Sequence, residues 1–369
     1  MLSHFLVLAI SLFVTFYIIK FSKIVDFGMD SNFDGDQKFH TQPIPRIGGI
    51  SVFFSFICGV LLLSFYMDDI TYPLMFVAAA TPIFLAGIIE DITGSVSAKI
   101  RLILTIASSA LAFWLLNAEI RSLGLDFVDV ILQVTIISFL VTLLIVSGIT
   151  QSINIIDGFN GLMPGVSIIS ALAISYAAFL SDDSLIMAMS LTLAMSIAGV
   201  MILNFPFGKI FMGDGGAYFI GFALAEMSIL LVHRNTDISP WFPIVVLAYP
   251  IMETLFSIYR KRIVRGQSAM IPDKLHLHML VHNRIICKIF KRSENYLSNS
   301  MTSPVMWLLS LITVFPAIVL RENTLALIAL FIYFAIVYVY IYKRIIRFAS
   351  KTKISDTVNN NINKKQSFK

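Results

Sequence analysis

Polar segments divide this chain into eleven long apolar runs, and these runs limit the architectures open to it. Each run approaches the ~20 residues that an α-helix needs to cross the hydrocarbon core of a bilayer. The predicted fold class is all-α, a polytopic membrane protein with about eleven transmembrane helices. The runs are Leu2–Ile19, Ile47–Tyr66, Tyr72–Ile89, Ile100–Ala118, Val130–Ile149, Met163–Leu180, Leu185–Leu203, Ala217–Val232, Trp241–Ile258, Val305–Leu320 and Leu325–Ile341.

The composition excludes the usual soluble classes. Only 13% of the 369 residues are charged and 57% are hydrophobic, whereas a soluble domain carries about 25% charged residues. This argues against a soluble enzyme, a disordered chain and a disulfide-stapled secreted domain. The two cysteines, Cys58 and Cys287, lie in an apolar and a basic segment and imply no disulfide framework. The first run lacks a basic leader and an A-x-A site, so we expect it to be a retained span.

The basic residues orient the helices. If the segment after the first run is cytoplasmic, 24 of the 27 Lys and Arg residues lie on that side, and only Arg121, Arg234 and Arg321 lie outside. Cytoplasmic loops of membrane proteins are enriched in Lys and Arg. We therefore predict an outside N-terminus and a cytoplasmic C-terminus, and we attribute the net charge of +5 to this bias, with no nucleic-acid partner.

The longer polar loops all fall on the predicted cytoplasmic side. Irregular polar backbone needs water or protein around it, so we expect the chemistry on this face. We predict one integral-membrane catalytic domain over 1–345, and a basic polar cytoplasmic tail over 346–369 that is disordered. The predicted cytoplasmic loops are 24–46, 90–99, 150–162, 204–216 and 259–301.

Two acidic motifs stand at ends of the runs. Glu90 and Asp91 end the third run, where paired carboxylates suit Mg²⁺ together with substrate phosphates. The alternative is an acidic helix end that only faces water. Asp214 lies in a Gly-rich segment that opens the eighth run, where helix-start amides favour phosphate. Here the alternative is a carboxylate that only caps the helix.

Polar amides surround a second turn. Asn154, Asp157 and Asn160 follow the fifth run in the segment NIIDGFNG, and Asn204 ends the seventh run. Their side chains offer hydrogen-bond donors and acceptors on a flexible, Gly-rich backbone. An ordinary turn between two spans is the alternative reading.

The largest loop is basic. Arg260–Arg262, Arg265, His276 and His278 provide cations that bind phosphate well. The two histidines lack the i, i+4 spacing of a helical zinc site, so zinc is disfavoured. The alternative for the arginines is the general cytoplasmic excess of positive charge. Glu253, near the inner end of its run, is expected to pair with Arg260–Arg262.

Further polar candidates flank the second and fourth runs. His40 and Arg46 precede the second run in a Pro- and Gly-rich segment, and Lys99 and Arg101 begin the fourth. An acidic metal site beside a basic phosphate site is what phosphoryl transfer requires. A transporter or lipid flippase is the rival class, and it predicts helices broken near mid-membrane and an inverted repeat. The sequence pattern indicates neither.

Five motifs in this order carry a family resemblance: PRIGGI, GIIEDITG, NIIDGFNG, FMGDGG and DKLHLH. The chain from about Phe39 to His278 resembles the polyprenyl-phosphate N-acetylhexosamine-1-phosphate transferases. That family includes undecaprenyl-phosphate GlcNAc-1-phosphate transferases and phospho-N-acetylmuramoyl-pentapeptide transferases. The resemblance implies transfer of a sugar-1-phosphate from a UDP-sugar to a lipid phosphate, with release of UMP, at the cytoplasmic face of the bacterial inner membrane.

The resemblance also assigns roles. It implies Mg²⁺ as cofactor, with Mn²⁺ as an alternative, and as partners a UDP-N-acetylhexosamine, undecaprenyl phosphate and the lipid bilayer; a homodimer is allowed. Asp91 would activate the lipid phosphate and Asp214 would bind the metal. The implied catalytic residues are Asp91, Glu90 and Asp214; the implied substrate-binding residues are His40, Lys99, Asn154, Asp157, Asn160, Asn204, Arg265, His276 and His278; the implied metal ligands are Asp214, Asp91 and Asp157.

Three positions depart from the family pattern. Glu90 stands where Asp is usual, Asn160 where Asp is frequent, and Met279 where a third histidine often follows. The muramoyl-pentapeptide branch fits less well than the branch that initiates O-antigen or teichoic acid. The expected product is therefore a lipid-linked GlcNAc-1-phosphate or a related sugar phosphate that starts a cell-envelope glycan.

Overall fold

The computed structural model describes residues 2–25, 28–30, 43–65, 70–266, 275–289 and 296–366, the last twenty by backbone alone. Most of these residues are helical, and β1 and β2 form a short antiparallel pair in which Met29 lies opposite Pro45. The elements are α1 (Leu2–Val25), β1 (Met29–Asp30), β2 (Ile44–Pro45), α2 (Gly48–Leu63), α3 (Thr71–Thr93), α4 (Ala98–Leu116), α5 (Asp126–Leu132), α6 (Thr135–Ile155), α7 (Leu162–Leu180), α8 (Ser184–Asn204), α9 (Gly213–Arg234), α10 (Trp241–Val246), α11 (Ala248–Tyr259), α12 (Leu277–Val281), α13 (Cys287–Ile289), α14 (Tyr296–Ser300), α15 (Thr302–Val319) and α16 (Thr324–Gln366).

Each of the eleven apolar runs contains one or two helices over its described residues, which confirms the predicted fold class. Nine helices in the described part of the chain are long and apolar enough to cross a membrane. The other two runs correspond to α2, which has 16 residues, and to α10 with α11, which divide the ninth run at Leu247. Pro250 has no N–H to bond the carbonyl four residues earlier, which accounts for the interruption. The sequence did not predict this break or the short helix α5.

Helix α9 forms the centre of the bundle. Of the apolar window in α9, 94% is buried, against 44% in α3 and α6, which pack beside it. Its neighbours include a group of aromatic rings: Phe53 stacks on Phe84 at 3.9 Å between centroids, and both contact Phe219. Lipid is as apolar as these side chains, so close packing rather than hydrophobic burial holds such helices together.

Glycines let α2 and α3 approach the start of α9. A Cβ atom added at Gly49 would lie 2.2 Å from the Gly216 nitrogen, and one added at Gly87 would lie 2.5 Å from Gly215 Cα. The amide of Gly49 also donates to the Met212 carbonyl at 2.8 Å. These contacts bring the polar ends of three helices to one place.

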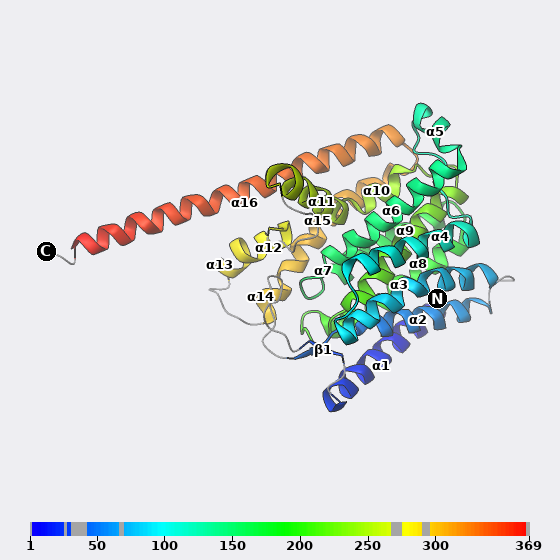
Figure 1. Ribbon diagram of the computed structural model, residues 1–369, viewed down its shortest axis with the longest axis horizontal. Helices are drawn as coiled ribbons and strands as arrows, with labels where there is room; N and C mark the ends of the chain where they lie inside the picture. Colours follow the sequence, from blue (N-terminus) through cyan, green and yellow to red (C-terminus); the bar gives the residue numbers. More distant parts are fainter. Residues whose placement is uncertain are drawn as a thin grey trace.

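The two ends of the bundle differ. In Figure 1, β1 and the short helices α12 to α14 lie at one end of the bundle, and α5 lies at the other. Helix α16 extends away from the bundle toward the C-terminus and continues as a helix to Gln366. The domain division at 345 and the disorder of 346–369 stay predictions, as does the orientation of the termini.

Candidate active site

The motifs converge at the start of α9. Arg46, from the segment before α2, places Nη2 2.9 Å from Asp214 Oδ1. Asn154, in the last turn of α6, donates to the same oxygen at 3.2 Å. Arg101, in the first turn of α4, forms an ion pair with Asp214 Oδ2. Four segments far apart in the chain therefore meet at one carboxylate that is only 7% exposed.

Asp91 fixes the start of α9. Its Oδ1 accepts from the Asp214 amide at 2.8 Å, and its Oδ2 accepts from the Gly215 amide at 2.9 Å. Its side chain is fully buried, and Arg46 Nε lies 3.5 Å from Oδ1. A helix start leaves its first amides without partners, and a carboxylate there is stabilised by the helix dipole. The carboxylate of Asp91 thus holds Asp214 in place, and its predicted activation of the lipid phosphate remains untested.

Asp157 lies in the turn that follows α6. Burial raises the pKa of its carboxyl to about 6, and the positive charge of Arg46 opposes that rise. Asp157 also interacts electrostatically with Asp91. Asp91 accepts from the Asp214 amide, whereas Asp157 is connected to Asp91 only through this charge interaction. The convergence of all three carboxylates therefore stays a prediction.

Glu90 and Lys99 lie at the margin of this cluster. Glu90 accepts a hydrogen bond from the Val96 amide at 2.7 Å, so it stabilises the turn between α3 and α4. Lys99 is exposed in the first turn of α4, whereas Arg101 two residues later reaches Asp214. Their predicted catalytic and phosphate-binding roles stay predictions.

Asn204 and Asn160 connect loops. Asn204 accepts from the Gly161 amide and donates to the Ile210 carbonyl, both at 2.6 Å. Asn160 is buried and donates from Nδ2 to Ser300 at 3.2 Å. These bonds hold the turn after α6 against neighbouring segments, and the predicted substrate contacts of the two residues remain untested.

The two histidines form a buried group with Glu253. The Nδ1 atoms of His276 and His278 each lie 3.2 Å from a Glu253 oxygen, and their rings stack 5.3 Å apart. The expected pairing of Glu253 with Arg260–Arg262 is wrong: Arg260 donates to the Leu275 carbonyl and the Tyr342 hydroxyl. A buried carboxylate takes the nearest donors, and here these are the imidazoles.

His278 faces the turn that carries Asp157. Its Nε2 is buried without a hydrogen-bond partner among the described residues, and it lies 3.9 Å from the point a Cβ at Gly158 would occupy. Burial lowers the pKa of His278, although the carboxylate of Glu253 opposes this. An unpartnered buried polar atom next to the turn of Asp157 is positioned for a ligand that the described residues do not supply.

Other predicted residues are less well placed. Arg265 is exposed at the end of the π-helical turn Arg260–Val264. His40 lies outside the described residues. Within the described ranges, no three His, Cys, Asp or Glu side chains are grouped as a metal site would require. The metal assignment to Asp214, Asp91 and Asp157 is thus not tested.

Sequence reasoning missed two features of the site. It gave Glu253 the wrong partner, and it gave Lys99 a role while leaving Arg101 without one. Helical periodicity could have placed Arg101 on the side of α4 that faces α9, because Thr105 and Ser108 follow at helical spacing and are buried. Nothing in the sequence links Glu253 to histidines more than twenty residues away.

Taken together, these features define a multi-pass membrane protein with a charged site at one end of its helices. The family described as Glycosyl transferase family 4 matches residues 73–232. The chain is 30% identical over 305 residues to a protein named probable undecaprenyl-phosphate N-acetylglucosaminyl 1-phosphate transferase from Bacillus subtilis, covering 82% of this chain and 80% of that protein.

Two further relatives have related names. A decaprenyl-phosphate N-acetylglucosaminephosphotransferase from Mycolicibacterium smegmatis is 31% identical, with 65% of each chain covered. An undecaprenyl-phosphate alpha-N-acetylglucosaminyl 1-phosphate transferase from Escherichia coli O157:H7 is 27% identical, with 74% of this chain and 75% of that protein covered. The chain belongs to the polyprenyl-phosphate N-acetylhexosamine-1-phosphate transferases of glycosyl transferase family 4.

Proposed function

We propose that this protein transfers N-acetylglucosamine-1-phosphate, or the phosphate of a related N-acetylhexosamine, from a UDP-sugar to undecaprenyl phosphate. The reaction takes place at the cytoplasmic face of the bacterial inner membrane and starts a cell-envelope glycan. The observation that carries the proposal is the meeting of Arg46, Arg101 and Asn154 at Asp214. The names of the relatives support the lipid phosphate acceptor and the transferred N-acetylglucosamine-1-phosphate group, and the UDP-sugar donor is part of the proposal.

The reaction balances as an exchange of phosphoanhydrides. An oxygen of the lipid phosphate attacks the β-phosphorus of the UDP-sugar, and the bond from that phosphorus to the bridging oxygen breaks, so UMP leaves. One anhydride is broken and one is formed. Arg46 and Arg101 can stabilise negative charge on the diphosphate. His278 Nε2 faces the turn that carries Asp157. Asp91 holds the start of α9 so that Asp214 keeps its position.

The donor set is compatible with Mg²⁺ or Mn²⁺. Asp214 and Asp157 offer oxygen ligands, and Mg²⁺ commonly takes one or two carboxylates and completes its shell with phosphate and water. An all-protein cage of three carboxylates is therefore not needed. When bound, the ion would neutralise charge on the diphosphate oxygens.

A transport function is not favoured. The break at Leu247 resembles the interrupted helices of transporters. The charged cluster, however, lies at the ends of α3, α4, α6 and α9 and not in their middle.

The test is transfer of labelled sugar phosphate by the full chain in lipid nanodiscs. Wild type with UDP-GlcNAc, undecaprenyl phosphate and Mg²⁺ should yield UMP and labelled lipid in equal amounts, and EDTA should abolish both until Mg²⁺ or Mn²⁺ is restored. Arg101→Ala should lower kcat about 100-fold, because it removes a cation that stabilises the negative charge developing on the diphosphate in the transition state. Asp214→Asn should lower it at least as much.

The matched control is Asp182→Asn in the exposed turn before α8, where φ is positive and Asn is well tolerated. It should transfer at the wild-type rate. Near-normal transfer by Asp214→Asn would remove that residue from the mechanism. A panel of other UDP-N-acetylhexosamines identifies the sugar, and no UMP with any of them would refute the proposed reaction.

A further inference from the structure

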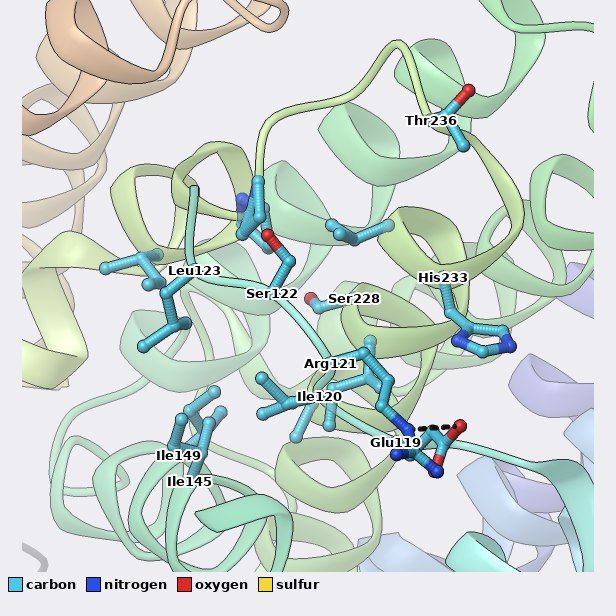
Figure 2. A pocket seen from close by; sticks show the side chains of 16 residues that line it. Glu119, Ile120, Arg121, Ser122, Leu123, Ile145, Ile149, Ser228, His233 and Thr236 are labelled. Carbon is cyan, nitrogen blue, oxygen red and sulfur yellow. Dashed lines mark ion pairs between the residues drawn. The ribbon is translucent and has the colours of Figure 1, made fainter. Parts of the chain in front are cut away.

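An apolar cavity lies at the opposite end of α9 from the charged site. Its volume is about 280 Å³, and its lining comes from α6, α9, α10 and the segment that joins α4 to α5. Figure 2 shows Ile145 and Ile149 side by side on one wall, and the segment Ile120–Leu123 crossing near them. Ile229, Val232 and Ile244 make it largely apolar.

We propose that this cavity binds the distal isoprene units of the polyprenyl phosphate acceptor. This inference rests on the proposed function, because it names where the far end of that acceptor lies. It assigns α6 and α9 a double role, since the same two helices carry Asn154 and Asp214 at their other ends.

The position of the cavity fits the length of the acceptor. At 1.5 Å rise per residue, Ala225 and Val232 lie roughly 16 to 27 Å along α9 from Asp214. An undecaprenyl chain of eleven isoprene units extends roughly 45 Å, which exceeds the hydrocarbon core of about 30 Å. A fully extended chain would pass the cavity, so with the phosphate at Asp214 the chain must bend near the far side of the bilayer for its distal units to lie in the cavity.

The rim of the cavity favours an uncharged chain end over a phospholipid. Arg121 Nε pairs with Glu119 at 2.8 Å, and its Nη1 donates to the Gln133 carbonyl at 2.9 Å. Figure 2 shows this ion pair at one edge of the cavity. An arginine already engaged in this way is poorly available to a phospholipid phosphate. The small volume also suits a chain end better than a whole lipid.

The interior needs no polar ligand. Ser228, which lines the cavity, donates to the Leu224 carbonyl of its own helix at 2.6 Å. Pro240, Pro243 and branched aliphatic side chains form most of the remaining wall, and the other polar lining residues are Glu119, Arg121, Ser122, His233 and Thr236. The methyl branches of an isoprenoid chain match such a surface.

The test fills the cavity and varies the acceptor. Ile145→Trp is compared with Leu144→Trp, whose side chain is 72% exposed on the same helix and does not line the cavity. For undecaprenyl phosphate, Ile145→Trp should raise KM about tenfold, since it excludes a few methylenes from an apolar site. For an acceptor of about three isoprene units, too short to reach the cavity, KM should stay at the wild-type value for both variants.

Each outcome of this comparison either supports or overturns the proposed binding of the distal isoprene units in the cavity. An equal change in KM for long and short acceptors, or no change for the long one, would overturn the proposal. Retained transfer to the short acceptor shows that the variant is folded. If wild type transfers to neither acceptor, the proposed function fails, whereas transfer without any length dependence refutes only this cavity.

Photolabelling gives a readout that does not depend on transfer. Undecaprenyl phosphate with a diazirine on its terminal isoprene unit should label peptides of α6 and α9 that contain the cavity residues. Excess unlabelled undecaprenyl phosphate should compete, and phosphatidylglycerol should not. Competition by phosphatidylglycerol would assign the cavity to a membrane lipid and overturn the proposal.

Discussion

At the scale of single residues, the site is built from pairs in which one side chain orients another. Asp91 holds the amides that position Asp214, and Glu253 holds the two histidines. Such supporting partners fix the geometry of groups that touch the ligand. The carboxylates of the site therefore differ in role, although the sequence presents them alike.

Glu253→Gln should reveal a positioning role. A glutamine oxygen can accept from one imidazole but not carry the charge that holds both, so kcat/KM for the UDP-sugar should fall by about 10- to 100-fold. Glu253 raises the pKa of His278 against the effect of burial. Without that charge the pKa falls further, so the limb of the pH profile that His278 governs should move to lower pH.

The control for this prediction is Glu322→Gln in the exposed turn before α16, where the glutamate pairs with Arg321. It should leave both kinetics and the pH profile unchanged. A Glu253→Gln enzyme with the wild-type profile and rate would contradict the positioning role.

At the scale of elements, close helix crossings bring the charged ends together. The start of α9 contacts α2 through Gly49 and Gly216, and α3 through Gly87 and Gly215. Arg46 lies just before α2 and Asp91 near the end of α3, so the two crossings set the distances of both side chains from Asp214. In a bilayer, small residues at such crossings are what permit close packing.

Gly49→Ala should lower both the transfer activity and the thermal stability of the protein. Its Cβ would lie 2.2 Å from a backbone nitrogen, so α2 must shift away from α9 and carry Arg46 with it. Overpacking of this kind costs about 1–3 kcal/mol, and thermal unfolding in detergent should occur at a lower temperature, with reduced transfer.

Gly148→Ala in α6 is the matched control for that change. An added Cβ at this position meets nothing within 4 Å, and alanine favours a helix over glycine. Its unfolding temperature should be equal to or higher than that of wild type. If Gly49→Ala unfolds no earlier than Gly148→Ala, the crossing does not constrain the bundle.

At the scale of the whole molecule, α9 connects two different ends. Its first residue follows Met212 beside the charged cluster, and Arg234 at its last turn pairs with Asp183 at 2.7 Å. The turns 94–97 and 181–183 therefore lie at opposite ends of the bundle. The excess of Lys and Arg predicts that the first of these turns is cytoplasmic.

Cysteine labelling checks this orientation. In a Cys58→Ala, Cys287→Ser background, Asp182→Cys should react with an impermeant maleimide in intact cells, and Ser95→Cys should react only after the membrane is permeabilised. Transfer by the cysteine-free chain at the wild-type rate is the control. The reverse labelling pattern would place the charged site outside and contradict its cytoplasmic location.

Much of the fold and part of the candidate site could be predicted from local sequence pattern. The spans, the all-α class and the grouping of Asp91, Asn154 and Asp214 follow from apolar run length and from polar motifs at run ends. The roles of Arg101 and Glu253 could not be, since neither residue belongs to a motif that indicates its partner. The break at Leu247 was signalled only by a proline that the apolar pattern conceals.

What the sequence by itself determined is which segments cross the bilayer, because in lipid every backbone N–H must bond within its own segment. Run length and hydropathy are local properties, so they need no knowledge of neighbouring helices. Only the tertiary structure decided which charges meet at Asp214 and what lines the apolar cavity at the other end of α9. Those contacts join residues far apart in the chain, and they depend on how closely the helix backbones can approach each other at their glycines.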